Sequence, residues 1–388
     1  MRTKLLVTNS RYSFLASFAQ AKRRDMGQGF LLALALSPLV GVAPALSEPQ
    51  QSASPCPPSQ IIQTITWHWE TRRTAAPGSD LWPVTWAADD NLYVAWGDGG
   101  GFGGTDQDGR VALGFGRIDG SPDQFAGINL NGGKNPEHPA SFPKHGKAGG
   151  IVAVGNRLYA WLNTQSGKWP DVDQALIWSD DRGATWNQSP WVFPKGRRNL
   201  KPSTFLNCGK GYTGLPANLG NFIYFYGPKQ GDAQQSYLGR APLDKLTDRQ
   251  PYEFFSGLNH EAPVWSADAD KARSIFADTK PAGDLASVVY VAGLKRYLLT
   301  IFHKGPGQLG IFDAPQPWGP WTTVAYYENW GQMGNEGQGL TCSFPAKWIS
   351  ADGLTLWCIF SAYGDGAKQG INAHDKFNLV KATLTPKQ

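Results

Sequence analysis

Five β-rich runs of aromatic and aliphatic residues recur along the chain at nearly regular intervals. They begin at Asn91, Arg157, Phe222, Arg296 and Thr355, with a mean interval of 66 residues. A shorter strand candidate and a turn precede each run, and a third strand candidate follows it. Such a unit, repeated five times, is typical of antiparallel propeller blades. The pattern predicts an all-β, five-bladed β-propeller in a single domain.

The flanking segments locate the other strands of each predicted blade. First strands are expected within "VTWAADD", "GIVAVGN", "LPANLGN", "SVVYVAGLK" and "KWISADG", and third strands within "RVALGFGRI", "QALIWSD", "SYLGRAPL", "QLGIFDAP" and "FNLVKATL". The segment Ile65–Thr71 is predicted to add an outer strand to the last blade and so close the ring. A two-sheet sandwich is the alternative, but it does not explain a period of 66 residues.

The N-terminal segment 1–47 is predicted to be an export signal. It joins a basic region to an apolar stretch broken by Gly and Pro, with small residues before a cleavage site. Arg23 and Arg24 allow a twin-arginine route besides the general secretory one, and a membrane anchor is the alternative. A Pro/Ser-rich leader, 48–60, precedes the propeller, 61–388. We expect a periplasmic or extracellular protein with no membrane span in its mature form.

Composition excludes several classes of protein. The chain has 46 Gly and 28 Pro, only 17% charged residues, and 48 aromatic residues (Trp, Tyr and Phe), which argues against coiled coils, helical bundles and disorder. Six of the 36 basic residues and one of the 31 acidic residues lie in 1–47, so the remainder balances at 30 of each. The mature chain therefore has no net positive charge with which to attract nucleic acid.

Four cysteines, Cys56, Cys208, Cys342 and Cys358, allow three disulfide pairings, and none of them has the spacing of a metal site. Cys342 and Cys358 flank one predicted hairpin. A turn near 352–353 would place Cys358 opposite Ala346, so no pairing is predicted.

Two aspartates flank the predicted inner hairpin of the first blade. Asp80 precedes its first strand and Asp98 follows its second, and the two ends of a hairpin lie at the same edge of a sheet. Adjacent strands are about 4.8 Å apart, so the two carboxylates can meet. Glycoside hydrolysis requires such a pair, one as acid and the other as base or nucleophile. Loop carboxylates that cap turn amides are the structural alternative.

Polar residues occupy analogous positions in the other blades, among them Lys210 and Asn335. Trp82 and Trp169 adjoin Pro-containing loop edges and are candidates for sugar stacking, although aromatic residues also pack between blades. The predicted substrate contacts are Trp82, His145, Lys147, Trp169, Tyr212, Asp284 and Glu336.

Three further motifs are assigned mainly structural roles. The glycine-rich segment 97–109 lacks the strand–loop–helix context of a phosphate cradle, and we interpret it as a loop over the site, although Asp106 and Asp108 could ligate calcium. "SDDRGATW" (179–186) fits the Asp-box turn of sialidase-type propellers. A Ser-His-Asp hydrolase is not supported, because the chain has no G-x-S-x-G.

Several segments together resemble a family of secreted bacterial propellers that was long catalogued as a domain of unknown function. They are "SDLWPVTWAADDNLYVAWGDGGGFGG", "PYEFFSGL", "GIFDAPQPWGPW", "KWISADG" and "FNLVKATL", which occur in this order over most of 65–385. The family includes endo-D-arabinanases, which cut the D-arabinan of mycobacterial cell walls. The resemblance places the family's paired acidic residues on Asp80 and Asp98. Family members often carry Asp where Asn221 stands here, which could alter the substrate.

These inferences predict a secreted glycosidase, by preference endo-acting on D-arabinofuranosyl chains, that uses Asp80 and Asp98. A non-catalytic carbohydrate-binding propeller and a polysaccharide lyase are the alternatives. No redox or nucleotide cofactor is expected, although a structural calcium or sodium ion could occupy the channel. The expected partner is a polysaccharide, and the expected state is a monomer.

Overall fold

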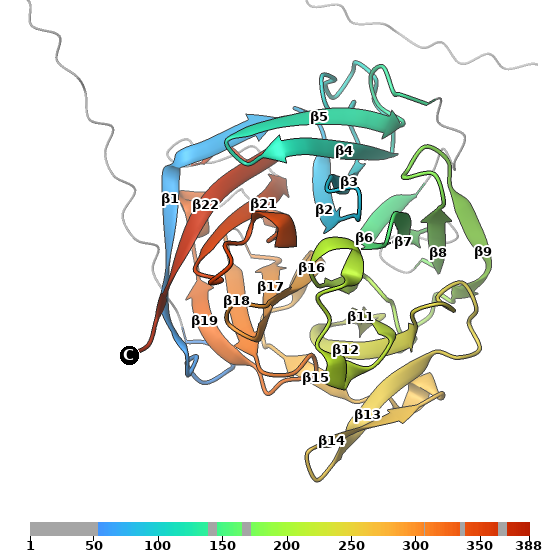
Figure 1. Ribbon diagram of the computed structural model, residues 1–388, viewed down its shortest axis with the longest axis vertical. Helices are drawn as coiled ribbons and strands as arrows, with labels where there is room; N and C mark the ends of the chain where they lie inside the picture. Colours follow the sequence, from blue (N-terminus) through green and yellow to red (C-terminus); the bar gives the residue numbers. More distant parts are fainter. Residues whose placement is uncertain (1–52, 139–145, 165–171, 306, 334–337, 364–370) are drawn as a thin grey trace, which may run out of the picture. The chain divides into compact units, whose positions relative to one another are not determined.

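The strands form consecutive antiparallel units around a common centre (Figure 1). In this computed structural model the described residues are 53–138, 146–164, 172–305, 307–333, 338–363 and 371–388. The predicted signal 1–47 and the first five residues of the leader, 48–52, lie outside them. The protein is all-β, as the repeat predicts, and the described strands group into five units, in agreement with the predicted blade count. Among the described residues, no helix has both the length and the apolar character needed to cross a bilayer.

The five long runs and the predicted third strands follow one another in each unit as predicted. Unit one contains β2 (Asp80–Trp86), β3 (Leu92–Gly97), β4 (Leu113–Ser121) and β5 (Gln124–Asn131). Unit two contains β6 (Lys147–Val154), β7 (Arg157–Asn163), β8 (Gln174–Ser179) and β9 (Asn187–Phe193). Unit three contains β10 (Thr204–Asn207), β11 (Phe222–Lys229), β12 (Asp232–Pro242), β13 (Glu253–Asn259), β14 (Ala262–Ser266) and β15 (Ser274–Ala277). Unit four contains β16 (Ala282–Val291), β17 (Arg296–His303), β18 (Leu309–Ala314) and β19 (Thr322–Tyr327). Unit five contains β20 (Gln338–Ser343), β21 (Thr355–Tyr363), β22 (Phe377–Pro386) and β1 (Ile62–Ala75).

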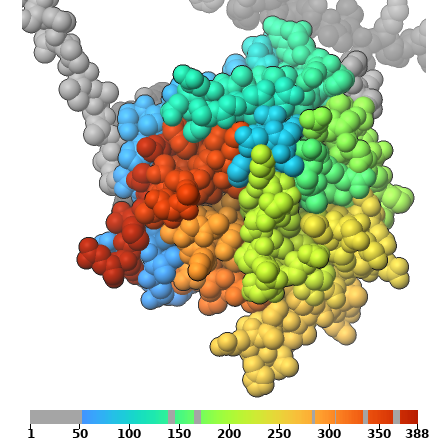
Figure 2. All heavy atoms as spheres, viewed as in Figure 1, coloured from blue at the N-terminus to red at the C-terminus, as the bar shows by residue number. Residues whose placement is uncertain are grey.

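Short helical turns and one hairpin stand outside this repeat. The 3₁₀ turns are η1 (Lys210–Tyr212), η2 (Ala217–Leu219), η3 (Ala269–Lys271), η4 (Trp330–Gln332) and η6 (Ala346–Trp348). The β13–β14 hairpin projects from the rim of the ring (Figures 1 and 2).

The outer strand of the last unit comes from the N-terminal side of the fold. β1 pairs antiparallel with β22, with Ile65 opposite Leu384, which confirms the predicted outer strand at 65–71. The Trp67 ring packs edge-on against Trp330 at a centroid distance of 4.8 Å, and Trp67 Nε1 donates to the hydroxyl of Tyr327. Residues far apart in the sequence therefore close the ring through backbone pairing and a shared aromatic core.

The first strands of the units, β2, β6, β10, β16 and β20, run in the same direction. Ala153 N of β6 donates to Thr85 Oγ1 of β2, and Asn207 Nδ2 of β10 donates to Ile151 O of β6. β10 pairs in parallel with β16, which joins units three and four into one sheet. The starts of these strands therefore lie on one face of the ring. We call this the N-terminal face.

The predicted first strands of units three and five are wrong. "LPANLGN" contains the turn η2, and "KWISADG" begins in the turn η6, whereas the first strands are β10 and β20. Lys210 and Tyr212 consequently follow β10 instead of preceding it. Lys210 Nζ lies 3.2 Å from Asp90 Oδ1 in the β2–β3 turn, and segment 210–220 contacts this turn at the centre of the face seen in Figure 2. These two residues are on the face opposite the N-terminal face.

The segment Ser179–Trp186 forms a turn closed by its own side chains. Asp181 Oδ1 accepts hydrogen bonds from Ser179 Oγ and from Thr185 N, both at 2.8 Å, while Gly183 N donates to Ser179 Oγ. The buried Trp186 ring stacks on Phe115 at 3.9 Å. The side chains of the segment Ser179–Trp186 therefore fix its turn, and Trp186 joins units one and two.

Cys342 and Cys358 lie diagonally across the β20–β21 pair. Cys342 pairs with Phe360 rather than with the residue that a short hairpin would place opposite it, because the turn η6 lengthens the connection between the two strands. Diagonal side chains of adjacent strands are within reach of one another, and the two sulfur atoms are 2.8 Å apart in the core. Burial raises the pKa of the Cys358 thiol well above its usual value, so the folded protein disfavours the reactive thiolate.

We expect these two thiols to form a disulfide when the chain folds with oxidised glutathione as oxidant, each thiol losing one hydrogen atom. Closing a loop of about 15 residues stabilises a protein by about 3 kcal/mol. Mass spectrometry should show the loss of two hydrogens relative to protein kept in reductant, and the urea midpoint should be higher without reductant than with it. Cys208→Ser is the control and should change neither result, whereas Cys342→Ser should abolish both. Equal masses with and without reductant would contradict the prediction.

Candidate active site

Asp80 and Asp98 come together at the N-terminal face. Asp80 is the first residue of β2 and pairs with Gly97, the residue before Asp98. A Cβ at position 97 would lie 2.5 Å from Asp80 Oδ1 and 3.2 Å from Lys147 Cδ. A side chain there would displace the Asp80 carboxylate, because this carboxylate and the Lys147 stem lie directly over the Gly97 backbone. The predicted hairpin places both aspartates at one edge.

Two cations contact Asp98. Lys147 Nζ, from the start of β6, lies 2.5 Å from Asp98 Oδ1, and Arg110 Nη2 lies 3.4 Å from the same atom. The Asp98 side chain is about one-third exposed, so water reaches it. Lys147 was predicted from sequence to contact substrate, and in the structure it bridges units one and two beside the acidic pair. The site thus combines two carboxylates with two positive charges.

The backbone of this hairpin is strained where it carries the acids. Leu81, Trp82 and Asp98 have φ values of 71°, 72° and 52°, and the β2–β3 register shifts between Leu81 and Val84. The Thr341 and Ser361 hydroxyls of unit five both donate to Leu81 O. Left-handed conformations in non-glycine residues persist only where the surroundings impose them, and they cluster at functional sites. Contacts between units therefore hold Asp80 in place.

Asp375, which sequence reasoning did not single out, is a third carboxyl at this site. Gly78 N, in the turn before Asp80, donates to Asp375 O at 2.6 Å, and His374 Nε2 lies 3.1 Å from Asp375 Oδ2. Burial raises the pKa of the Asp375 carboxyl, and the nearby charges of Asp98 and Asp106 raise it further, against the opposing effect of His374. Asp375 therefore tends to retain its proton at a higher pH than an ordinary aspartate.

Tyr363 is a second residue that the sequence analysis missed. It ends β21, its strand partner is Gln338 at the start of β20, and the neighbouring Ala362 is bridged to His374. Its side chain is 56% exposed, unlike most large apolar residues of the described chain. An exposed aromatic ring at the N-terminal face is suited to stacking on a sugar. Tyr363 could not be singled out from the sequence, because aromatic residues are dense throughout the strands.

Two predicted substrate contacts are incompatible with the structure. Trp82 is fully buried, donates to Ser79 O, and stacks on Trp96 at 5.6 Å. Tyr212 is buried on the opposite face, where its hydroxyl accepts a hydrogen bond from Tyr224 N. Both side chains pack in the core, so neither ring can meet a ligand. Asn221 also lies away from the acids, since it precedes β11 at the end where β10 finishes.

Three further predicted substrate contacts, His145, Trp169 and Glu336, lie outside the described residues, as does Asn335. Asp284 belongs to β16, near the start of the strand, which places its backbone toward the N-terminal face.

The predicted calcium ligands of the glycine-rich segment face cations. Asp106 pairs with Arg110, and Asp108 Oδ2 lies 2.5 Å from Lys134 Nζ. Among the described residues, no group of three His, Cys, Asp or Glu side chains is arranged to hold a metal ion.

Comparisons with known proteins add the following. Residues 149–337 match the model of a family described as a domain of unknown function (DUF4185). No curated protein matches the sequence.

Several solved structures resemble the fold at low sequence identity. A putative exo-β-1,3-galactanase from Bifidobacterium bifidum has a TM-score of 0.47 and 9% identity, over 80% of this chain and 95% of that one. The α-L-arabinofuranosidase PaAbf62A from Podospora anserina has a TM-score of 0.44 and 12% identity, over 81% and 92%. A GH43_1 enzyme from Xanthomonas citri has a TM-score of 0.42 and 12% identity, over 87% and 94%. With scores below 0.5, these similarities carry no inference about the activity of this chain.

Proposed function

We propose that the protein is a glycoside hydrolase and that Asp80 and Asp98 are its catalytic pair. The observation that carries this proposal is the convergence of Asp80, Asp98 and Lys147 over Gly97. Hydrolysis of a glycosidic bond needs one carboxyl to protonate the leaving oxygen and another to act as nucleophile or to activate water. Two carboxylates at adjacent strand positions, of which Asp98 is about one-third exposed, meet that need without a cofactor.

The surroundings suggest a division of roles. Lys147 and Arg110 balance the negative charge of Asp98, which suits this residue to act as base or nucleophile. Asp80 is then the proton donor, held over Gly97 by the strained β2 backbone. Burial and the charge of Asp98 raise the pKa of the Asp375 carboxyl beside the pair, against the opposing effect of His374, and so favour its neutral form.

The raised pKa of Asp375 predicts how stability depends on pH. Between the ordinary aspartate pKa of about 3.9 and the raised value, the folded state binds more protons than the unfolded state, so stability falls as pH rises through this interval. Asp375→Asn removes the ionisable group and with it this fall in stability. We expect its melting temperature to change less steeply with pH than that of the wild type in thermal unfolding from pH 4 to 8. Parallel curves for the two proteins would contradict the assignment.

We further propose that the substrate is a D-arabinofuranosyl polysaccharide cut internally. The support is the ordered resemblance of the hairpin sequence 79–104 and four later segments to secreted propellers that include endo-D-arabinanases. Tyr363, exposed at the N-terminal face, offers a ring on which a sugar could stack. Export fits such a substrate, since a cell-wall polysaccharide lies outside the cytoplasm.

The test is to incubate the protein with mycobacterial arabinogalactan and to measure reducing ends and product size. An endo-hydrolase releases a ladder of oligosaccharides, with Asp98→Asn as the inactive reference. Products that absorb in the ultraviolet would identify a lyase instead. Binding without release of reducing ends would identify a carbohydrate-binding module, and release from another glycan alone would overturn the arabinan assignment.

A further inference from the structure

A large pocket opens beside the acidic site, where units two, three and four meet. Its volume is about 790 Å³, within the range of small-molecule sites. Its walls come from the start of β10, the β11–β12 turn and the start of β16, and so from the N-terminal face. Asn163, at its edge, is the strand partner of Lys147, which contacts Asp98. Paired strands are about 4.8 Å apart, so the edge of the pocket is one strand spacing from the backbone of Lys147, whose side chain contacts Asp98.

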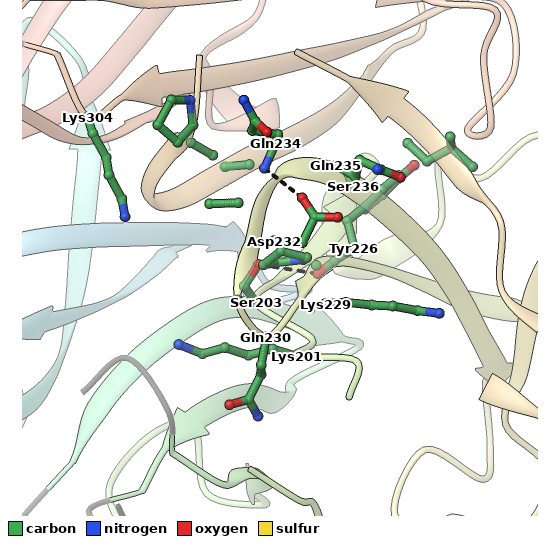
Figure 3. Close-up of a pocket in the computed structure, with 18 of the residues that line it drawn as sticks. Lys201, Ser203, Tyr226, Lys229, Gln230, Asp232, Gln234, Gln235, Ser236 and Lys304 are labelled. Atoms are coloured by element: carbon green, nitrogen blue, oxygen red, sulfur yellow. Dashed lines mark hydrogen bonds between the residues drawn. The ribbon is translucent and has the colours of Figure 1, made fainter. Parts of the chain in front are cut away.

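The charged side chains that line this pocket are mostly basic. Arg197, Lys201, Lys229 and Lys304 contribute positive charge, and Asp232 is the one carboxylate among the described lining residues. Figure 3 shows Lys201 and Lys304 extending to the same side of the pocket, whereas Lys229 points the other way. Lys229 Nζ lies 4.9 Å from the centroid of the Tyr237 ring. Lys201 and Lys304, on different units, therefore form the cationic part of the cavity.

The Asp232 carboxylate and the Gln230 amide nitrogen make hydrogen bonds to the backbone around the pocket. Asp232 Oδ1 accepts a hydrogen bond from Gln234 N, which fixes the β11–β12 turn. Gln230 Nε2 donates to Val172 O and Pro194 O, which orients the amide. Its Oε1 and the Oδ1 of Asn163, both in side chains 5% exposed, have no hydrogen-bond partner among the described residues. Buried acceptors without donors are costly, and a ligand hydroxyl would satisfy them.

We propose that this pocket is a subsite for a glycan that carries a negatively charged group, either a carboxylate or a phosphate. Lys201 and Lys304 would bind the anion by charge-assisted hydrogen bonds, and the amide oxygens of Asn163 and Gln230 would accept from sugar hydroxyls. This inference rests on the proposed function. It narrows the substrate class to chains with an anionic substituent next to the bond that is cleaved.

Titration calorimetry at low ionic strength tests the subsite. The probes are D-arabinose 5-phosphate, tri-galacturonate, inorganic phosphate and a neutral arabino-oligosaccharide. We expect at least one charged sugar to bind more tightly than the neutral one, with an affinity that falls as salt is added. Lys201→Gln and Lys304→Gln should each weaken that binding about tenfold, the usual effect of one charge-assisted contact. Preference for the phosphate or for the uronate identifies the anion, and inorganic phosphate alone measures the contribution of the charge.

Lys295→Gln is the matched control, because Lys295 lies in the turn at the other end of the strand β17 that leads to Lys304. It should bind every probe like the wild type. Equal affinities in all variants, or no binding of either charged sugar, would overturn the subsite. The two proposals can fail separately: anion binding by the wild type without hydrolysis of any glycan rejects only the proposed function. Hydrolysis of neutral arabinan with no anion binding rejects only the subsite.

Discussion

Asp80→Asn and Asp98→Asn should each lower kcat on a polysaccharide substrate by about 10²- to 10⁴-fold, the usual contribution of a positioned acid or base. Asparagine fills the same space but can neither give up a proton as a carboxylic acid nor act as a carboxylate. Asp98 is partly exposed, and ion pairs of this kind contribute about 0–1 kcal/mol, so the melting temperature should change little. Initial rates of reducing-end release, measured with thermal unfolding of the same samples, check both statements.

The two variants should differ when the leaving group is changed. A dinitrophenyl glycoside leaves without protonation, so the variant that lacks the proton donor recovers activity on it, whereas the variant that lacks the base or nucleophile does not. We expect recovery in Asp80→Asn. Asp119→Asn is the matched control, because Asp119 lies toward the other end of β4 in the same unit and pairs with Arg117. Recovery in Asp98→Asn instead would reverse the roles, and full activity in both variants would remove the pair from catalysis.

Asp278→Ala should cost about 3–5 kcal/mol of unfolding free energy, because it breaks a buried charged network. Asp278 Oδ2 lies 2.9 Å from His303 Nε2, and the Tyr326 hydroxyl donates to the same carboxylate at 2.9 Å. Burial opposes the charged form of Asp278, but hydrogen bonds from His303, from the Lys280 amide and from Tyr326 outweigh it, and the pKa of this carboxyl is lowered. The alanine variant leaves a histidine and a tyrosine hydroxyl buried without this partner.

Urea unfolding at neutral pH measures this loss, and acid provides a second check. Because the folded-state pKa of Asp278 is lowered, its contribution is present above about pH 3.9 and disappears as pH falls through the folded value. The difference between wild type and Asp278→Ala should therefore narrow in acid. Asp123→Ala, which removes an exposed pair with Arg73, should cost less than about 1 kcal/mol. A similar cost for both variants would show that the network contributes little.

The part of the site that could be predicted from sequence is the part fixed by one hairpin. Asp80 and Asp98 flank two strands joined by a short turn, so the register alone places them together. The first strand of unit three could not be found in this way. β10 has four residues, too few to show an alternating pattern, whereas the apolar residues around η2 imitate a strand. Lys210 was therefore expected before the first strand, a position that Lys201 occupies in the structure.

Other contributions to the site depend on how the ring closes. Asp375 approaches the acids from unit five, and Tyr363 of the same unit lies at the N-terminal face. No local pattern connects either residue to a hairpin almost 300 positions earlier. The burial of Trp82 likewise follows from contacts with Phe377 of the last unit, at a ring-centroid distance of 5.4 Å. Hydrophobic periodicity indicates which residues form strands, but it does not indicate which units become neighbours.

The pairing of β1 with β22 has a consequence for how the chain acquires its structure. The Lys381 amide donates to the Thr71 hydroxyl, 310 positions away in the sequence. Contacts between such distant segments are slow to form, because the intervening chain loses entropy before the contact stabilises it. A nascent chain therefore presents β1 and β21 as open edges until β22 is available, and open edges promote aggregation. We therefore expect ring closure to be a late, slow step of folding.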